Sequence, residues 1–192
     1  MAERCAVLVL LALLAAGCGG APSRSRAELT NPFLGPDYSA WLIGPVARIA
    51  TTQEIEEFLS LQDDRQAAAF VQAFWSHRDP APDKPGNPVQ EAFDARSAEA
   101  DRLYSEAGLL GRRTDRGAVY VVYGKPAKVE FAVSPIPNGP PLEVWTYASD
   151  APSGLNARRP AGLYRFVKQG DRTVLYIVGA RPALIQPQEP IQ

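Results

Sequence analysis

The chain has 192 residues, of which 46% are hydrophobic and 21% charged, and its formal net charge is −1 at pH 7. This length suits one domain with a tail, and the balance of 20 basic and 21 acidic residues provides no field to attract nucleic acid, which is not expected as a partner. Eighteen prolines, nearly double the usual share of about 5%, predict long ordered loops and extended ends around a compact centre.

The N-terminus carries an uninterrupted apolar run from Cys5 to Ala16. The run is much shorter than the roughly 20 residues that a transmembrane helix needs, and it is typical of the apolar region of a secretory signal. One interpretation is an ordinary signal peptide that is cleaved near Ala16 or Gly17. The other depends on the residues that end the run.

The segment Leu14-Ala15-Ala16-Gly17-Cys18 resembles a bacterial lipobox. This resemblance implies a lipoprotein signal at residues 1–17, with cleavage before Cys18 and a lipid (palmitate-type acyl chains) on its sulfur. Residues 18–36 would then form a flexible linker from the membrane. Gly19, which is not an aspartate, is compatible with sorting to the outer membrane. We therefore expect a location in the cell envelope, facing the periplasm.

Few residues remain for catalysis or metal binding. Without its signal and with Cys18 lipidated, the mature chain has no free thiol, so it has neither a cysteine nucleophile nor a cysteine-ligated metal. His77 is the only histidine, and its position predicts an exposed helix end. The motif Gly-x-Ser-x-Gly is absent. We predict no catalytic residue, no metal and no cofactor.

The first half of the chain predicts helices. The apolar segment 37–49 is expected to pack onto the domain, and Thr51-Thr-Gln-Glu54 has the pattern of a capping box that starts a helix of about ten residues. A second start signal at residues 63–66 precedes a helix that ends by Arg78-Asp79-Pro80. Asn87 and Pro88 form an N-cap and first-turn pair for a third helix, which reaches about residue 107.

The second half predicts strands. Residues 119–123 are rich in β-branched and aromatic side chains, and 129–131 form a short extended piece. Further strands are predicted at 142–147, 163–167 and 172–178, with a hairpin turn at 169–171 and a proline-rich tail over 181–192. The fold class is therefore α+β. About three N-terminal helices pack on a C-terminal antiparallel sheet of about four strands, in one domain over 37–180.

The candidate site is a polar cluster between Gly111 and Gly117, at the predicted boundary between helices and strands. It consists of Arg112, Arg113, Thr114, Asp115 and Arg116, to which Arg78 and Asp79 are added. In a functional interpretation the guanidinium groups surround an anion. In the structural interpretation, which we favour, Asp115 accepts backbone amides and Arg116 or Arg78 joins helix to sheet as a buried pair. Arg112 and Arg113 are expected to face solvent.

The aromatic residues are interpreted mainly as core. They are Trp75, Tyr104, Tyr120, Tyr123, Trp145, Tyr147 and Tyr164. A four-stranded sheet can nevertheless leave one face uncovered, and an exposed aromatic stripe there would form a site for a partner protein.

Three blocks together resemble the bacterial GWxTD-domain family over about residues 40–150. They are Phe74-Trp-Ser-His-Arg-Asp-Pro80, then Asn87, Glu91, Phe93 and Arg96, and then Gly111, Thr114, Asp115, Arg116 and Gly117 with Tyr123-Gly-x-Pro126. Glu143-Val-Trp-Thr-Tyr147 is also similar. In this chain Arg112 replaces the signature tryptophan, so no role of that tryptophan transfers. The resemblance implies a secreted or lipid-anchored protein and no particular chemistry.

These observations lead to two functional expectations. The first is a lipid-anchored envelope protein without enzymatic activity, bound to the membrane through its N-terminal lipid and acting on envelope proteins by contact or scaffolding. The alternative is an anion- or small-ligand-binding domain, with hydrolysis as an option, whose arginine-lined pocket lies around residue 78 and residues 112–116.

Overall fold

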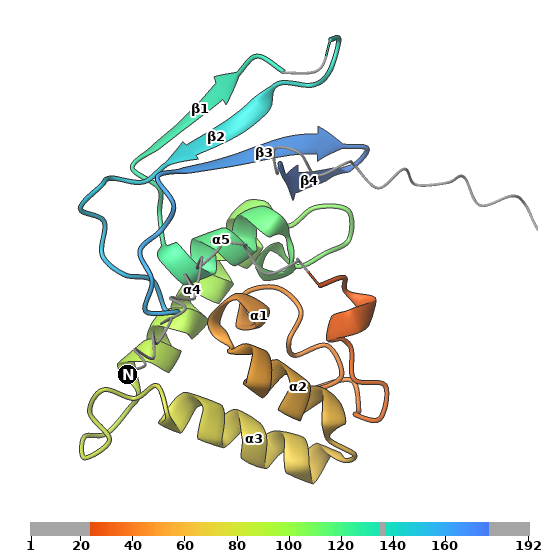
Figure 1. Cartoon of the computed structure of the whole chain (residues 1–192), viewed down its shortest axis with the longest axis vertical. Coiled ribbons are helices and arrows are strands. Elements are labelled where there is room, and N and C mark those ends of the chain that lie inside the picture. Colours follow the sequence, from red (N-terminus) through yellow and green to blue (C-terminus); the bar gives the residue numbers. More distant parts are fainter. Residues whose placement is uncertain (1–23, 135–136, 177–192) are drawn as a thin grey trace, which may run out of the picture.

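The protein is described by a computed structural model over residues 24–134 and 137–176. Within these ranges a set of helices precedes a four-stranded antiparallel sheet, which confirms the α+β class (Figure 1). The helices are η1 (Ala27–Leu29), α1 (Val46–Ile49), α2 (Thr52–Ser60), α3 (Asp64–Ser76), α4 (Pro88–Tyr104), η2 (Gly111–Arg113) and α5 (Asp115–Tyr123). The strands are β1 (Lys128–Ala132), β2 (Leu142–Thr146), β3 (Leu163–Gln169) and β4 (Arg172–Leu175). The predicted signal peptide, Cys18 and the tail 181–192 lie outside the described residues.

The predicted helix starts are confirmed. Thr51 and Glu54 form a reciprocal capping box at α2, and the Asp63 carboxylate accepts the backbone N–H of Gln66 at α3. The Asn87 side chain caps α4, whose first residue is Pro88. These signals operate within three residues of the cap, so their outcome depends little on the rest of the fold.

The prediction of a strand at residues 119–123 is wrong. These residues form most of α5, and the first strand starts at Lys128. Every residue from Gly117 to Val122 is buried, so α5 is covered on all sides and its β-branched side chains contribute to the core from every face of the helix. Burial in the tertiary structure outweighs the modest strand preference of valine and tyrosine. The helices therefore number more than the three expected.

The part of the expected linker that the structure describes is packed against the domain. Leu29 and Leu34 are buried, and Asn31 is fully buried. The Asn31 Nδ2 donates to the carbonyl oxygens of Phe58 and Leu61, both at 2.9 Å, where α2 ends. The ordered domain therefore begins well before residue 37, because a linker segment supplies the hydrogen bonds that the last turn of α2 lacks.

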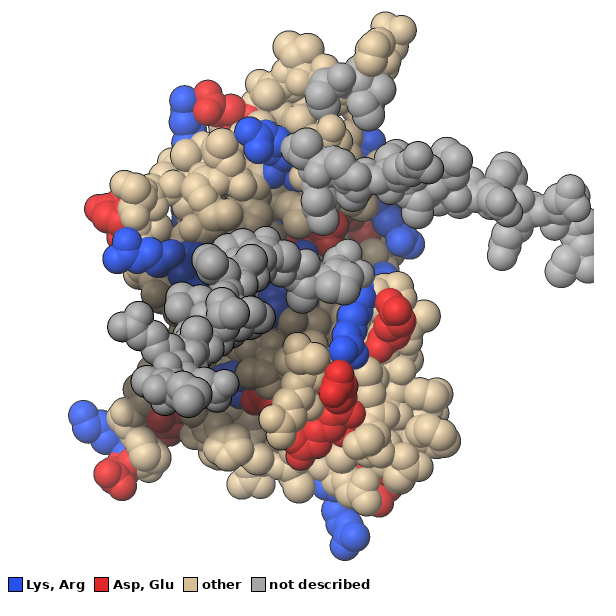
Figure 2. Space-filling model, in the orientation of Figure 1, with Lys and Arg blue, Asp and Glu red and all other residues tan. Residues whose placement is uncertain are grey.

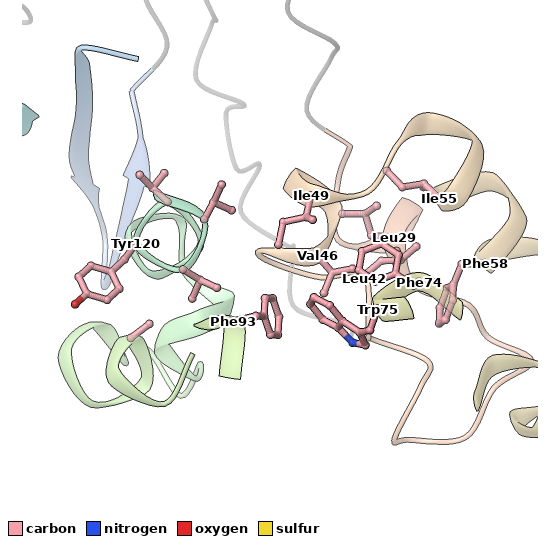
Figure 3. Close-up of a cluster of buried hydrophobic side chains, with 14 of the residues drawn as sticks. Leu29, Leu42, Val46, Ile49, Ile55, Phe58, Phe74, Trp75, Phe93 and Tyr120 are labelled. Carbon is pink, nitrogen blue, oxygen red and sulfur yellow. The ribbon is translucent and has the colours of Figure 1, made fainter. Parts of the chain in front are cut away.

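The core runs between the N-terminal segment and the helices. Figure 3 shows Leu29, Leu42, Val46 and Ile49 facing Phe74 and Trp75, with Phe93 of α4 next in line. Aromatic pairs continue this packing, with ring centroids 5.0 Å apart for Phe74 and Trp75 and 4.9 Å apart for Trp75 and Phe93. Segment 37–49 therefore packs onto the domain as predicted.

The sheet has the simple order β1-β2-β3-β4. The turn between β3 and β4 contains Gly170 with a φ of 61°, a left-handed conformation that favours glycine, which confirms the predicted hairpin. Trp145 of β2 is fully buried against Tyr104, with ring centroids 5.4 Å apart, so the face that carries Trp145 is the helix-facing side. The opposite face carries a small second cluster of Leu142, Val144 and Val167.

No described helix is long and apolar enough to cross a membrane. On the face shown in Figure 2, acidic and basic side chains lie interspersed, and the tip of the β1–β2 hairpin at the top is mostly uncharged.

Candidate functional site

Two glycines allow α4, η2 and α5 to approach closely. A Cβ atom added at Gly111 would lie 1.8 Å from the carbonyl oxygen of Ala100 in α4. A Cβ atom added at Gly117 would lie 1.8 Å from the carbonyl oxygen of Gly111. Both distances are far below van der Waals contact and both neighbours are backbone atoms, so only glycine fits at either position.

Thr114 and Asp115 begin α5. The buried Thr114 hydroxyl donates to the Gly111 carbonyl oxygen at 2.8 Å and accepts the Gly117 N–H at 3.1 Å. Asp115 is the first helical residue, and its Oδ2 accepts the backbone N–H of Leu175 in β4 at 2.7 Å. Its Oδ1 lies 3.8 Å from a guanidinium nitrogen of Arg48. Thr114 thus caps the helix, and Asp115 joins its first turn to the last strand.

Arg116 connects three parts of the fold. Its Nη2 donates to Glu106 at 2.8 Å, in the segment after α4, and its Nη1 donates to Glu143 of β2 at 3.0 Å. Glu106 also accepts the backbone N–H of Thr173 in β4 at 2.8 Å, and Glu143 accepts the indole N–H of Trp145 at 2.7 Å. The three charged side chains are only 21%, 13% and 15% exposed. One mostly buried cation therefore holds two carboxylates, each of which accepts a hydrogen bond from a residue of the sheet.

Arg112 is partly exposed, but it is also paired with Asp101 of α4, which was not expected. Its backbone N–H donates to Asp101 Oδ1 and its Nε to Asp101 Oδ2, both at 2.8 Å. Burial raises the pKa of the Asp101 carboxyl, but the hydrogen bonds from Arg112 outweigh burial and hold this pKa below its ordinary value of 3.8. Arg112 therefore fastens η2 to the end of α4.

We expect Arg112→Trp to lower the free energy of unfolding by about 1 kcal/mol, because an indole has one N–H donor and no charge with which to hold Asp101. The figure is modest because the Arg112 side chain is 39% exposed. Urea unfolding would measure it. Arg113→Trp is the matched control, since Arg113 is exposed and we expect no change there. A more stable Arg112→Trp protein would contradict the pairing argument and indicate that the position packs inward.

Arg78 lies in a different environment, at the end of α3. Its Nη1 and Nη2 donate to the two oxygens of Glu54 at 2.8 and 2.7 Å, and its guanidinium lies 3.6 Å from the centroid of the Phe74 ring. The Arg78 and Glu54 side chains are 16% and 20% exposed. Asp79 accepts the backbone N–H of Ala81 at 2.9 Å. Arg78 therefore joins α3 to the capping box of α2, and Asp79 stabilises the following turn.

The Arg78–Glu54 pair predicts a pH dependence of stability. Burial raises the pKa of Glu54, but hydrogen bonds from Arg78 and Thr51 lower it below its ordinary value of 4.5. A carboxylate with a depressed folded pKa stabilises the fold above its unfolded pKa, and this stabilisation is lost as the pH falls through the folded value. Glu54→Gln should therefore be less stable than the parent at pH 7, and the difference should shrink as the pH falls below 4.5.

Urea unfolding at pH 7 and pH 3 would measure this difference. Glu57→Gln, which alters an exposed residue of the same helix, is the control and should follow the parent at both pH values. A difference between Glu54→Gln and the parent that stays constant with pH would refute the assignment.

Arg113 is exposed as expected and lies near Arg26. The pKa of Arg26 is lowered by burial, then by the charges of Arg172 and Arg113, and is raised in part by Asp115. These arginines come from the N-terminal segment, η2 and β4, so separate parts of the chain bring basic side chains close to Arg26.

The predicted cluster therefore separates into distinct contacts. Thr114, Asp115 and Arg116 cooperate around the start of α5, Arg112 contacts α4, and Arg78 and Asp79 belong to the end of α3. The carboxylate partners Glu54, Asp101, Glu106 and Glu143 were not anticipated from the sequence. The sequence singled out Glu54 only as a helix-capping residue and Glu143 only within the block Glu143–Tyr147.

Arg96 of α4 has a role that sequence reasoning also missed. Its Nη1 donates to the carbonyl oxygens of Val121 and Val122, at 3.2 and 3.1 Å, in the last turn of α5. Tyr147 donates through its hydroxyl to the carbonyl oxygen of Gly124, the C-cap residue, at 2.8 Å. A cation and a hydroxyl thus satisfy carbonyl groups that a helix C-terminus leaves unpaired.

Two hollows occur near α3, with volumes of about 460 and 600 Å³. The first is lined by residues that include Trp75, Asp79 and Asn87, and the second by residues that include Glu54, Phe74 and His77; neither lining includes an arginine. His77 is the exposed C-cap residue of α3, as predicted. Within 24–134 and 137–176, no group of three or more His, Cys, Asp or Glu side chains could hold a metal ion.

The geometry defines a class of protein: an α+β domain in which one helix, α5, buried from Gly117 to Val122, is fixed between α4 and an antiparallel sheet by glycine contacts and ion pairs. The model of the GWxTD domain family matches residues 33–157, and this protein belongs to that family. The match extends past both ends of the predicted segment 40–150 and ends before β3 and β4. No curated protein and no solved structure matches the chain.

Proposed function

We propose that this protein is a lipid-anchored component of the cell envelope, held in the outer membrane and facing the periplasm, that acts as a non-catalytic protein-interaction or scaffolding module. The lipid anchor is supported by the segment Leu14–Cys18, which ends an apolar run that is too short to span a membrane. Family membership supports the proposal only through the implied envelope location.

The scaffolding role is supported by how the polar residues of the candidate site are used. Arg78, Arg112 and Arg116 are each bonded to carboxylates of the same chain, and Thr114 and Asp115 are bonded to the backbone. In these positions their hydrogen-bonding groups stabilise the domain. An anion bound between the arginines would have to displace a carboxylate partner, which favours the scaffolding role over the arginine-lined anion pocket.

The lipid anchor is tested by Cys18→Ser. We expect this variant to lose incorporation of a palmitate analogue that can be detected chemically, and to leave the outer-membrane fraction, because the acylated sulfur is absent. Cys5→Ser removes the other cysteine of the chain and should keep both properties. Unchanged labelling and fractionation of Cys18→Ser would refute the anchor.

The interaction role is tested separately, by crosslinking in the intact envelope and identification of the trapped proteins by mass spectrometry. Scaffolding predicts that the same crosslinked species recur from independent preparations. Recovery of the protein without any crosslinked partner would contradict it.

A further inference from the structure

Strand β1 and the residue that follows it present a row of exposed apolar side chains. Val129, Phe131 and Val133 are 50%, 74% and 91% exposed, and they alternate along the chain. Val129 lies opposite Trp145 of β2 and Phe131 lies opposite Glu143. Directly opposite residues of an antiparallel pair share a face, so Val129 and Phe131 point to the helix-facing side of the sheet. Figure 1 shows α5 beneath β3 and β4, whereas β1 lies at the other edge.

The same residues have backbone groups at the open edge of the sheet. Tyr147, which directly follows β2, donates its N–H to Gly162 beside β3 at 3.0 Å. Backbone groups alternate in direction along a strand, so Glu143 and Trp145 also bond β3, while Leu142, Val144 and Thr146 bond β1. The partners of these last three are Ala132, Glu130 and Lys128. The N–H and C=O groups of Val129 and Phe131 therefore point away from β2, toward the edge of the sheet that no described strand pairs.

We propose that a second copy of this chain pairs with β1 in antiparallel fashion, with a twofold axis at Phe131. Phe131 would then lie opposite Phe131 of the second copy, and Val129 opposite Val133. This register matches all three exposed apolar side chains with apolar partners, and it uses the free backbone groups of Val129 and Phe131. The two sheets would become one continuous sheet of eight strands.

Neighbouring registers are less favourable. A twofold axis at Glu130 would place two Glu130 carboxylates opposite each other, which is destabilising. An axis at Val129 would place Lys128 opposite Glu130, but these side chains already form an ion pair within one chain at 2.7 Å. That register would also place Phe131 opposite Ala127 and leave Val133 without an apolar partner. An axis at Ala132 would pair Phe131 with Val133, but it would place Val129 opposite Pro135, which has no N–H to donate. The sequence therefore favours the axis at Phe131.

Both charges of β1 lie on the face opposite the apolar row. Lys128 and Glu130 alternate with Val129 and Phe131, so they point away from the helix-facing side. Natural edge strands are commonly protected by charges that oppose pairing, and here the apolar row contains none. Stable complexes bury roughly 1,200–2,000 Å² of surface, and a single pair of strands buries less. The fraction of dimer should therefore rise with protein concentration.

Single cysteine substitutions test the register directly. In the full chain, Phe131→Cys should give a disulfide-linked dimer under mild oxidation, because the twofold axis places the two thiols opposite each other. Val129→Cys and Glu130→Cys are matched controls, whose thiols would be too far from their symmetry mates. We expect at least about tenfold more dimer from Phe131→Cys than from either control, above the background that Cys5 and Cys18 give in the parent. The proposal would be overturned if Val129→Cys or Glu130→Cys gave the most disulfide-linked dimer, or if all three variants gave equal amounts.

A charge swap provides a second test, without added cysteines. Phe131→Glu and Phe131→Lys should each shift the full chain to the monomer mass in light scattering, because each places like charges on the twofold axis. An equimolar mixture of the two variants should recover the dimer, because the introduced carboxylate lies opposite the introduced ammonium group only in the mixed pair. A parent that stays monomeric at every concentration, or a mixture that stays monomeric, would refute the pairing. These results do not depend on the lipid anchor, which Cys18→Ser tests separately.

Discussion

Gly117→Ala and Gly111→Ala are each expected to lower the free energy of unfolding by about 3 kcal/mol or more. An added Cβ at either position would lie 1.8 Å from a backbone carbonyl oxygen. Relief would require α5 and η2 to move away from each other or from α4, which would disturb the packing of the buried residues Gly117–Val122 of α5. Urea unfolding followed by circular dichroism would measure the loss.

The Gly117 substitution separates two opposing effects. Gly117 lies within α5, where alanine is the better helix former by about 1 kcal/mol. Helix propensity alone therefore predicts that Gly117→Ala stabilises the protein, whereas close packing predicts a large destabilisation. Gly162→Ala is the matched control, because nothing lies within 4 Å of an added Cβ there. A Gly117→Ala protein as stable as the Gly162→Ala protein would contradict the close approach of these segments.

Arg116→Ala is the second substitution with a large expected effect, a loss of about 3–5 kcal/mol. It would leave Glu106 and Glu143 as two mostly buried carboxylates without their shared cation. Both carboxylates also accept hydrogen bonds from the sheet, so they cannot turn to solvent without releasing Thr173 and Trp145. Chemical unfolding at pH 7 would measure the loss.

The control for Arg116→Ala is Lys128→Ala. Lys128 and Glu130 form an ion pair in which both side chains are about half exposed or more, and its loss should change stability by no more than about 0.5 kcal/mol. Combining Arg116→Met with Glu106→Gln and Glu143→Gln should recover more than half of the loss, because the uncompensated charges are removed. Equal effects of Arg116→Ala and Lys128→Ala would show that the buried network contributes little.

The start of α5 shows why part of the site was open to prediction and part was not. Thr114 followed by Asp115 is a usable helix-start signal, a cap residue and then an acid in the first turn. The valines and tyrosines that follow favour a strand in isolation, and their preference determined the wrong prediction. The buried Gly117 contact and the closed layer around the helix reverse that preference, and neither can be recognised within the segment itself.

The sequence alone determined the features that depend on neighbours in the chain. The caps at Thr51, Asp63 and Asn87 and the turn at Gly170 follow from hydrogen bonds and backbone angles within a few residues. Only the tertiary structure decided the helical state of residues 115–123 and the carboxylate partners of Arg78, Arg112 and Arg116. Those partners lie 10 to 27 residues away, and the strand amide bound by Asp115 lies 60 residues away. A side chain's type shows that it needs a partner, but packing determines which one it reaches.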